Sequence, residues 1–285
     1  MGAAALWQAN YFAAKGWDVL VLCREDDGRP KALGPGVTWI RWDAPLAATN
    51  LPDMVRSAVR LRRHLRHFAP TTVHVHGLRS FATARTLRRH VFLTNHTFDT
   101  LDEPRSLRAF AYRMLPLLAQ EAFAVAPGLG KRWTVLPHAS PRLGELTPSP
   151  VTQSDHLSVL WLGRLTPQKR PQDFIRAVAV ASRTRDVRGV IIGDGPLEQE
   201  CRMLALQLGS PVQFERQRAD VHTLFVQADC FCLLSNFEGV PFAVQEAMWC
   251  ALPVVLTPLP ALRWFAGTAA TTLGMSMRRR QRSWR

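Results

Sequence analysis

Two glutamates with seven residues between them, Glu238 and Glu246, are the first residues whose type and spacing could do chemistry. Glu238 lies in a turn after a predicted buried strand, Cys230 to Leu234, and Glu246 lies inside a short helix that opens at Pro241. In a parallel sheet this edge is where ligands bind, and the free amides at a helix start favour anions. The two carboxylates therefore predict a binding site at the carboxyl edge of a sheet.

Two cations follow another predicted strand, Ser158 to Leu162, in the segment 163–169, which reads Gly-Arg-Leu-Thr-Pro-Gln-Lys. The planar guanidinium of Arg164 can donate two parallel hydrogen bonds to phosphate oxygens, and Lys169 supplies a mobile point charge. Fixed cations of this kind stabilise the negative charge that grows on a departing phosphate in a transition state. The alternative interpretation is that they are two surface cations in a loop.

A glycine turn, Gly193-Asp194-Gly195-Pro196, follows the predicted strand Gly189 to Ile192. Its glycines let the chain reverse sharply, and the proline suits the start of a helix. The pattern Gly-x-Gly-x-x-Gly is not completed, so the turn is not a dinucleotide fingerprint. We interpret it as mainly structural.

The composition limits the class of partner. The formal net charge is +14, but only four of the 36 basic residues are lysines. Such an excess of arginine reflects genome base composition more often than a nucleic-acid groove, so anionic lipid or simple surface charge is favoured over nucleic acid. Five cysteines without disulfide or zinc spacing, no long apolar run and no signal-peptide layout predict a cytoplasmic location.

Alternating predicted elements indicate an α/β fold with parallel sheets. In the first half, helices are predicted at Ala3 to Lys15, Asp53 to Phe68, Leu78 to His90 and Arg105 to Gln120, and strands at Trp17 to Cys23, Val37 to Trp42, Thr72 to His76, Val91 to Thr94, Ala122 to Ala126 and Thr134 to Leu136. In the second half, strands are predicted at Ser158 to Leu162, Gly189 to Ile192, Val212 to Phe214, Cys230 to Leu234 and from Pro253. They alternate with helices predicted at Pro171 to Ala181, Leu197 to Leu208, Asp220 to Gln227 and from Pro241.

Two features of the first half have alternative interpretations. The helix Asp53 to Phe68 is rich in arginine, and no acid occurs between Met54 and His90. It is either a solvated face or a basic amphipathic surface that lies on anionic membrane. His96 follows a predicted strand and could hydrogen-bond a sugar or a phosphate, or it could be structural.

Several motifs together resemble the retaining glycosyltransferases of family 4, the "glycosyl transferases group 1" set with the two-domain GT-B architecture. They are Gly-Arg-Leu…Lys at 163–169, Gly-Asp-Gly-Pro at 193–196, Ser-x-x-Glu-Gly-x-Pro at 235–241 and Glu-Ala-Met at 246–248. The resemblance covers Ala3 to about Ala261 and implies two Rossmann-like parallel-sheet domains facing a cleft. The implied domains are 1–139 on the acceptor side, a linker at 140–157, a donor-binding domain at 158–265 and a disordered basic tail at 266–285.

The resemblance also implies roles for these residues. Arg164, Lys169 and Glu238, with His96 from the first domain, would be catalytic. The residues that hold the nucleotide-sugar donor would be Gly163, Arg164, Lys169, Gly193, Glu238, Gly239, Val240 and Glu246. Glu246 would accept hydrogen bonds from ribose hydroxyls. No metal and no tightly bound cofactor are expected, because an Asp-x-Asp carboxylate pair is absent from the sequence.

Departures from the family pattern set further expectations. The family's first strand and its last helices have no counterpart, so both domains are expected to be incomplete. Glu215-Arg216-Gln217 stands where the family has a glycine near the base, which leaves UDP and GDP both open. Ala251 stands where a glycine usually ends the helix, and a left-handed conformation there would cost on the order of 1 kcal/mol.

The leading hypothesis is a metal-independent, retaining hexosyltransferase that uses a UDP- or GDP-sugar and a glycan or lipid-linked acceptor. It would be cytoplasmic or peripheral on the inner membrane face. One alternative is an inactive, truncated derivative that at most binds nucleotide. A third hypothesis is an arginine-rich module for anionic lipid or nucleic acid.

Overall fold

The computed structural model describes residues 3–23, 30, 32–42, 51–76, 90–96, 114, 117, 119–128, 131–146, 155–216 and 221–267. The chain folds into two compact units. Unit 1 comprises Met1–His96, Glu103–Val125 and Leu129–His138, and unit 2 comprises Thr97–Asp102, Ala126–Gly128 and Ala139–Arg285. Each unit is described by itself.

Unit 2 is built on one sheet of five parallel strands in the order β11-β10-β7-β8-β9. The strands are β7 (Leu157–Leu162), β8 (Val187–Ile192), β9 (Val212–Glu215), β10 (Cys230–Leu233) and β11 (Val254–Leu256). The chain starts in the middle of the sheet, winds outward to β9, and then returns to the other side of β7. The predicted parallel, doubly wound sheet is therefore confirmed.

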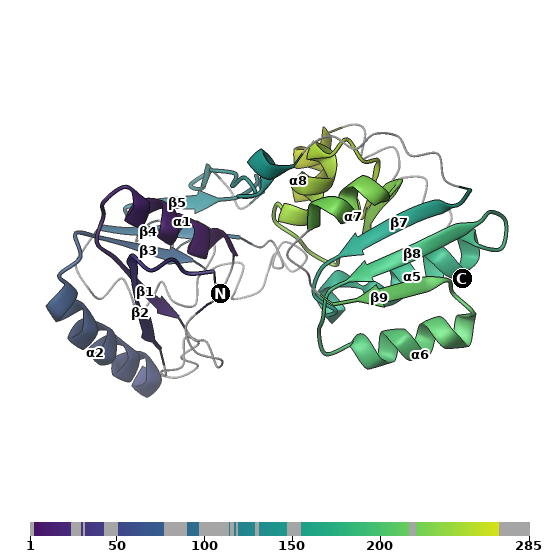
Figure 1. The fold of residues 1–285 in the computed structure, drawn as a ribbon. Coiled ribbons are helices and arrows are strands. Elements are labelled where there is room, and N and C mark those ends of the chain that lie inside the picture. The colour runs from purple at the N-terminus through teal and green to yellow at the C-terminus, as the bar shows by residue number, and fades with distance from the viewer. Residues whose placement is uncertain are drawn as a thin grey trace. The chain divides into compact units, whose positions relative to one another are not determined.

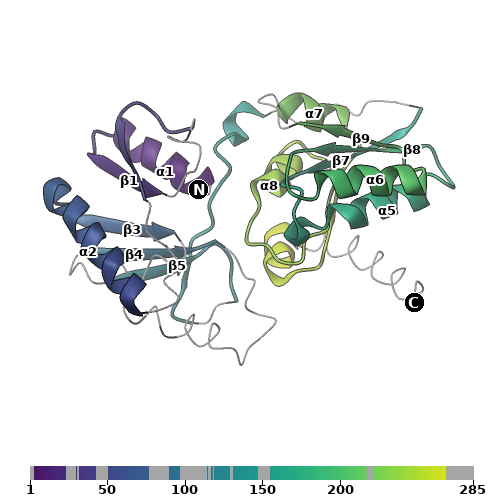
Figure 2. The same ribbon diagram turned by 90° about the horizontal axis from the view of Figure 1, so that it is seen from below.

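The helices of unit 2 cover both faces of this sheet (Figures 1 and 2). Helices α5 (Pro171–Ala181) and α6 (Glu198–Leu208) lie on one face, and α7 (Val221–Gln227) and α8 (Phe242–Trp249) lie on the other. This division follows from the reversal of strand order at β7, because right-handed crossovers in opposite directions place their helices on opposite faces. In open α/β sheets, ligands bind at the carboxyl ends of the strands beside such a reversal, and the candidate residues occur at these ends.

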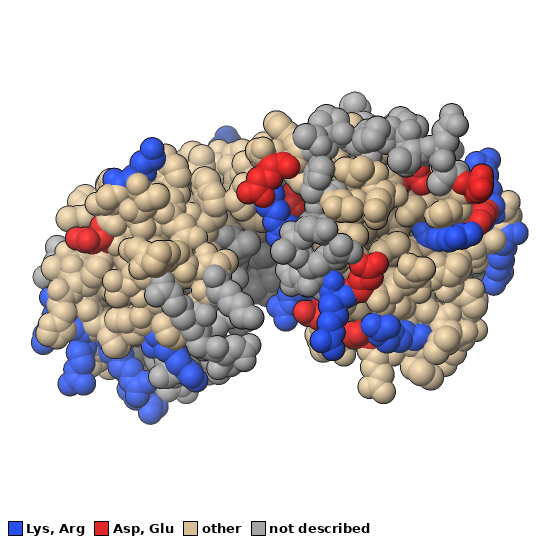
Figure 3. Space-filling model, in the orientation of Figure 1, with Lys and Arg blue, Asp and Glu red and all other residues tan. Residues whose placement is uncertain are grey.

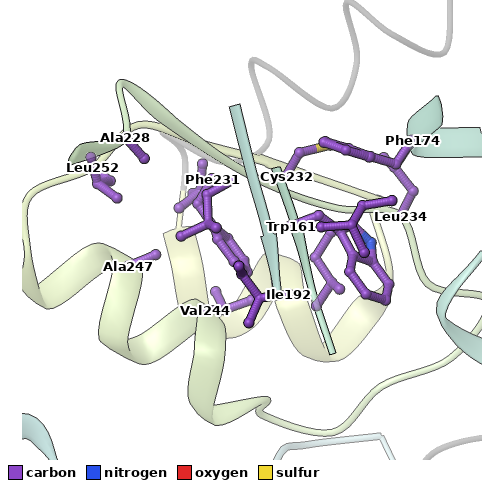
Figure 4. Packing of buried hydrophobic residues seen from close by; sticks show 14 of the residues in the cluster. Trp161, Phe174, Ile192, Ala228, Phe231, Cys232, Leu234, Val244, Ala247 and Leu252 are labelled. Atoms are coloured by element: carbon purple, nitrogen blue, oxygen red, sulfur yellow. The ribbon is translucent and has the colours of Figure 1, made fainter. Parts of the chain in front are cut away.

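Large apolar side chains fill the space between the sheet and its helices (Figure 4). Trp161, Phe174, Phe225 and Phe231 are each at most 1% exposed. Burial of a side chain of this size contributes about 1.5–3 kcal/mol, so these four side chains hold the two layers together. Because β7 and β10 run through the middle of this core, the loops that leave them start from fixed positions.

The two loops that follow β7 and β8 touch through their main chains. The N–H of Gly163 donates to the carbonyl of Ile192 at 3.1 Å, and the N–H of Leu165 donates to the carbonyl of Asp194 at 2.7 Å. A Cβ at Gly193 would overlap the carbonyl oxygen of Gly163, and a Cβ at Gly195 would lie within 2.8 Å of three main-chain atoms of Leu165. The glycine turn is therefore needed so that the two loops can approach each other.

Unit 1 contains parallel strands in two separate sheets. The strands are β1 (Val19–Cys23), β2 (Val37–Arg41), β3 (Thr72–His76), β4 (His90–Asn95), β5 (Glu121–Ala124) and β6 (Thr134–Val135). One sheet pairs β1 with β2, and the other has the order β3-β4-β5-β6. The sequence predicted parallel pairing, which is confirmed, but not the division into two sheets.

Two helices of unit 1 are described over their full length, α1 (Ala3–Ala14) and α2 (Leu51–Phe68). Arginine side chains gather along α2 (Figure 3). Five arginines of this helix are exposed: Arg56, Arg60, Arg62, Arg63 and Arg66. The predicted helices at 78–90 and 105–120 lie mostly outside the described residues.

Part of the predicted linker at 140–157 is a packed element of unit 2. A single 3-10 turn, η2 (Leu143–Glu145), leads to Leu146, which is 7% exposed in the core of this unit. At the other end, residues 260–267 are helical and include Ala266, which is buried. Residues 268–285 of the predicted tail lie outside the described residues.

Replacing Gly193 with alanine should destabilise unit 2 by about 3 kcal/mol or more, because φ is 142° there and the new Cβ would overlap the Gly163 carbonyl. Gly209→Ala is the matched control. Its φ is 58°, and no atom lies within 4 Å of the added Cβ. The expected loss there is about 1 kcal/mol. Urea unfolding measures both, and equal losses would contradict the close approach.

Candidate functional site

Two loops at the carboxyl edge of the unit 2 sheet are joined by hydrogen bonds in both directions. The loop after β7 contains the turn η3 (Pro167–Lys169), and the other loop follows β10. Asn236 donates from its main-chain N–H to the carbonyl of Gln168 at 2.8 Å and from Nδ2 to the carbonyl of Pro167 at 3.1 Å. Gln168 Nε2 donates back to the carbonyl of Phe237 at 3.0 Å. The predicted site residues on these two loops are thus held side by side.

The predicted site residues Lys169 and Glu238 form an ion pair across these loops. Their side chains are 18% and 7% exposed, so both charges are largely withdrawn from water. A buried charge is costly unless it is paired, and each group supplies the other's partner. The structure therefore brings together one cation and one carboxylate that the sequence placed on neighbouring strand ends.

The other cation, Arg164, is exposed and has no ion-pair partner among the described residues. Arg170, next to Lys169, pairs with Asp173 and caps the start of α5 in a left-handed conformation, with φ 47° and ψ 52°. Such a conformation is uncommon for a residue with a side chain and marks local strain. The loop thus presents one free guanidinium, one paired ammonium and one strained main-chain position.

Glu246 lies inside α8 and is only 3% exposed. Its Oε1 accepts a hydrogen bond of 2.5 Å from Ser140 Oγ, and Arg142 Nη1 lies 3.8 Å from its Oε2. Sequence reasoning missed Ser140 and Arg142, because the segment around them has no periodicity and was assigned to a linker. The carboxylate is enclosed by residues of its own unit.

Two of the glycines predicted to bind the donor, Gly163 and Gly193, form main-chain hydrogen bonds within unit 2. The N–H of Gly163 donates to Ile192, and the N–H of Gly193 donates to the carbonyl of Glu215 at 3.0 Å. Gly239 and Val240 are buried immediately before α8, whose N-terminal cap is Pro241. Whether any of these four residues holds a ligand stays a prediction.

In unit 1, His96 belongs to a cluster of four histidines. His74 and His76 lie on β3, His96 follows β4, and His138 follows β6. The ring centroids of successive members, in the order His74, His76, His96, His138, are 4.3, 5.1 and 5.5 Å apart. His76 Nδ1 and His96 Nε2 lie 2.8 Å apart and share a hydrogen bond. The parallel register, in which His76 pairs with Thr94, brings these residues together.

Burial lowers the pKa of three of these histidines, His74, His76 and His96. The pKa of His76 falls to about 3 and that of His96 to about 4, chiefly because burial disfavours the charged form and secondarily because the neighbouring histidines repel it. Both rings are therefore neutral at neutral pH. No set of three or more His, Cys, Asp or Glu side chains is placed to hold a metal ion in the part of the chain that the structure describes.

Two family models match the chain, one in each half. "Glycosyl transferase 4-like domain" matches residues 1–127, and "Glycosyl transferases group 1" matches residues 156–272, past Ala261, where we expected the resemblance to end. The second match includes both joined loops and α8. Both halves of the chain thus match glycosyltransferase family models, and the second half is similar to the glycosyl transferases group 1 family.

Curated proteins with similar sequences include a glycosyltransferase. An α-1,4-N-acetyl-D-galactosaminyltransferase of Campylobacter jejuni, named for a diphosphoundecaprenol-linked acceptor, is 34% identical over 93 residues, which are 32% of this chain and 26% of the relative. The matches span less than a third of the length of the curated relatives.

Solved structures show the same fold. Sucrose-phosphate synthase from Thermosynechococcus elongatus has a TM-score of 0.73 at 17% identity over 96% of this chain and 82% of that one. HepE of Anabaena, solved with UDP-glucose, has a TM-score of 0.67 at 17% identity over 96% and 85%. The GT-B fold predicted from the sequence is confirmed.

Acid should weaken unit 1 through the histidine cluster. Both folded pKa values lie below the ordinary value of 6.5, so between about pH 6.5 and 4 the unfolded chain binds more protons. Stability should be complete above about pH 6.5 and fall as the pH is lowered. Urea unfolding at pH 7.5 and pH 5 measures the loss, which His76→Gln should reduce. The exposed His67→Gln is the control, and an equal loss in both variants would contradict the assignment.

Proposed function

We propose that the protein is a hexosyltransferase that moves a sugar from a nucleotide-diphosphate donor to a glycan or lipid-linked acceptor with retention of configuration. The observation that carries the proposal is the pairing of Lys169 with Glu238 on two joined loops, beside the exposed Arg164. The match of residues 156–272 to the glycosyl transferases group 1 family supports it, because that match covers this edge. Neither a metal nor a covalent enzyme nucleophile takes part in the proposed reaction.

The two cations would stabilise the leaving group. Cleavage of the bond between the sugar and the β-phosphate leaves negative charge on that phosphate. Arg164 can bind its oxygens as a fork, and Lys169 can turn toward it from Glu238. Cations fixed by a folded edge need no reorganisation as the charge develops, which is why such an arrangement lowers a barrier. Glu238 would then be free to accept hydrogen bonds from the sugar hydroxyls.

The donor is proposed to be a UDP- or GDP-sugar. A UDP-sugar is supported by the Anabaena HepE structure, which was solved in complex with UDP-glucose. Glu246 would accept hydrogen bonds from the ribose hydroxyls. The base would lie near the end of β9, where the carbonyl of Glu215 accepts a hydrogen bond from the N–H of Gly193. A contact of His96 with the donor sugar or its phosphates stays a prediction from the sequence.

The acceptor is proposed to be a glycan. The name of the Campylobacter relative includes a glycan linked to diphosphoundecaprenol, which supports a lipid-linked acceptor. The exposed arginines of α2 support a peripheral position on the anionic inner face of a membrane, because each such charge near the surface adds about 1 kcal/mol of attraction. No helix in the described ranges is both long enough and apolar enough to span a bilayer.

Replacing Lys169 with alanine should reduce donor hydrolysis or transfer about 10²- to 10³-fold, the usual cost of losing one group that stabilises transition-state charge. Lys15→Ala, in unit 1, is the matched control, since Lys15 lies over the ring of Tyr11. Turnover of UDP-sugars and GDP-sugars is measured together with calorimetric binding of UDP and GDP. Unchanged turnover in Lys169→Ala would contradict the proposal, and binding without any turnover would favour a nucleotide-binding protein that is not an enzyme.

Replacing Glu238 with glutamine should preserve the fold, at a cost in stability because Lys169 loses its charged partner. It should reduce turnover at least 10-fold, because the amide keeps the shape of the carboxylate but loses its charge and one acceptor. Circular dichroism and thermal unfolding establish folding, and the donor assay measures turnover. Glu198→Gln, which alters an exposed ion pair with Arg202 on α6, is the control. Equal turnover in the two variants would exclude Glu238 from the proposed site.

A further inference from the structure

A short segment of unit 2, residues 139–146, lies along α8 and is held at both ends; we call it the strap. Near its start, the N–H of Ser140 donates to Gln245 Oε1 at 2.8 Å. At its end, Trp249 Nε1 donates to the carbonyl of Leu146 at 3.2 Å, and Leu146 itself is buried in the core. These contacts hold the strap on α8 without the hydroxyl of Ser140.

The hydroxyl of Ser140 has a different role, because it donates to Glu246 Oε1 at 2.5 Å. Arg142 approaches the other carboxylate oxygen at 3.8 Å, and its own side chain is 41% exposed. The Glu246 side chain is 4% exposed, so a ligand can reach its oxygens only if the strap gives way. The strap therefore both covers and satisfies this carboxylate.

A ribose ring presents two adjacent hydroxyls, and both would donate to the oxygens of Glu246 in the proposed function. One of these oxygens already accepts from Ser140. Because the Ser140 hydroxyl and a ribose hydroxyl are the same kind of donor, they compete for one acceptor with nearly equal hydrogen bonds. Release of Ser140 also opens the covered carboxylate.

We infer that the ribose of a nucleoside diphosphate displaces Ser140 from Glu246 and loosens the start of the strap. This inference rests on the proposed function, since it needs a nucleotide at Glu246. The main-chain bond to Gln245 is two atoms away from the bond that breaks and is the next to be weakened. The hydrogen bond of Ser140 thus lowers the affinity for ribose, and it breaks when ribose binds.

The location of the strap gives this exchange a consequence for the whole chain. His138 is the last residue of unit 1 in this part of the sequence, and Ala139 is the first of unit 2. The residues that ribose would release therefore directly follow one of the points at which the chain passes from unit 1 to unit 2.

Calorimetric titration of three proteins tests the exchange: the unchanged chain, Ser140→Ala and Ser140→Thr. Ser140→Ala should bind UDP about 10-fold more tightly, because UDP no longer displaces a hydrogen bond to a charged group. It should bind 2′,3′-dideoxyuridine diphosphate, which lacks both hydroxyls, as the unchanged chain does. Ser140→Thr keeps the hydroxyl and should bind UDP as the unchanged chain does. Ser182→Ala, whose hydroxyl bonds only within its own helix end, is the matched control.

The outcomes separate this inference from the proposed function. If UDP binds the unchanged chain but Ser140→Ala binds it equally or more weakly, the exchange is wrong while donor binding stands. If neither UDP nor GDP binds any of the proteins, donor binding is wrong and the exchange falls with it. Hydrogen exchange of residues 139–146 should become faster when UDP is added to the unchanged chain. Unchanged or slower exchange in the UDP-bound chain would overturn the inference.

Discussion

The close contact between two glycine-containing turns sets the position of every charged group at the edge of unit 2. The main chain of Gly163 and Leu165 bonds to Ile192 and Asp194, at a separation that admits no side chain on Gly193. The turn η3 follows directly from this contact. Because Gln168 in that turn bonds to the loop after β10, the contact at Gly193 indirectly places Lys169 against Glu238.

Much of unit 2 could be predicted because its signals are local or periodic. The bounds of α5, Pro171–Ala181, were predicted to the residue, since a proline and an apolar stripe define both its start and its buried face. The pairing of Lys169 with Glu238 follows from their places after neighbouring strands, which is a property of parallel sheets.

Contacts made by polar residues in irregular segments could not be predicted. Ser140 reaches Glu246 across 106 positions of sequence, and Asn236 reaches Pro167 across 69. Neither contact leaves a pattern, because a turn or a strap has no repeating face. The histidine cluster was missed for a related reason, since its members meet only through the register of three strands. The sequence placed His96 at a strand end but did not indicate its three neighbours.

Of the three described residues with side chains that take the left-handed conformation, Ala69 lies in unit 1 and the other two lie in unit 2. Arg170 has φ 47° and Ala251 has φ 59°, the latter at the end of α8, where the family pattern has a glycine. Each costs about 1 kcal/mol or more relative to glycine. Both lie next to an element that carries a candidate group, Lys169 in one case and Glu246 in the other. The strain is therefore concentrated around the proposed donor site rather than spread over the unit.

The pairing of Lys169 with Glu238 has a consequence for the anions that a cell contains in excess. An ammonium that already has a carboxylate beside it is a poor receptor for inorganic phosphate, because a small anion would have to separate two mostly buried charges with little else to gain. A nucleotide sugar can supply hydroxyls for Glu238 and a diphosphate for Lys169 in the same event. In the proposed reaction, the ion pair thus acts as a filter that excludes free phosphate and admits the complete donor.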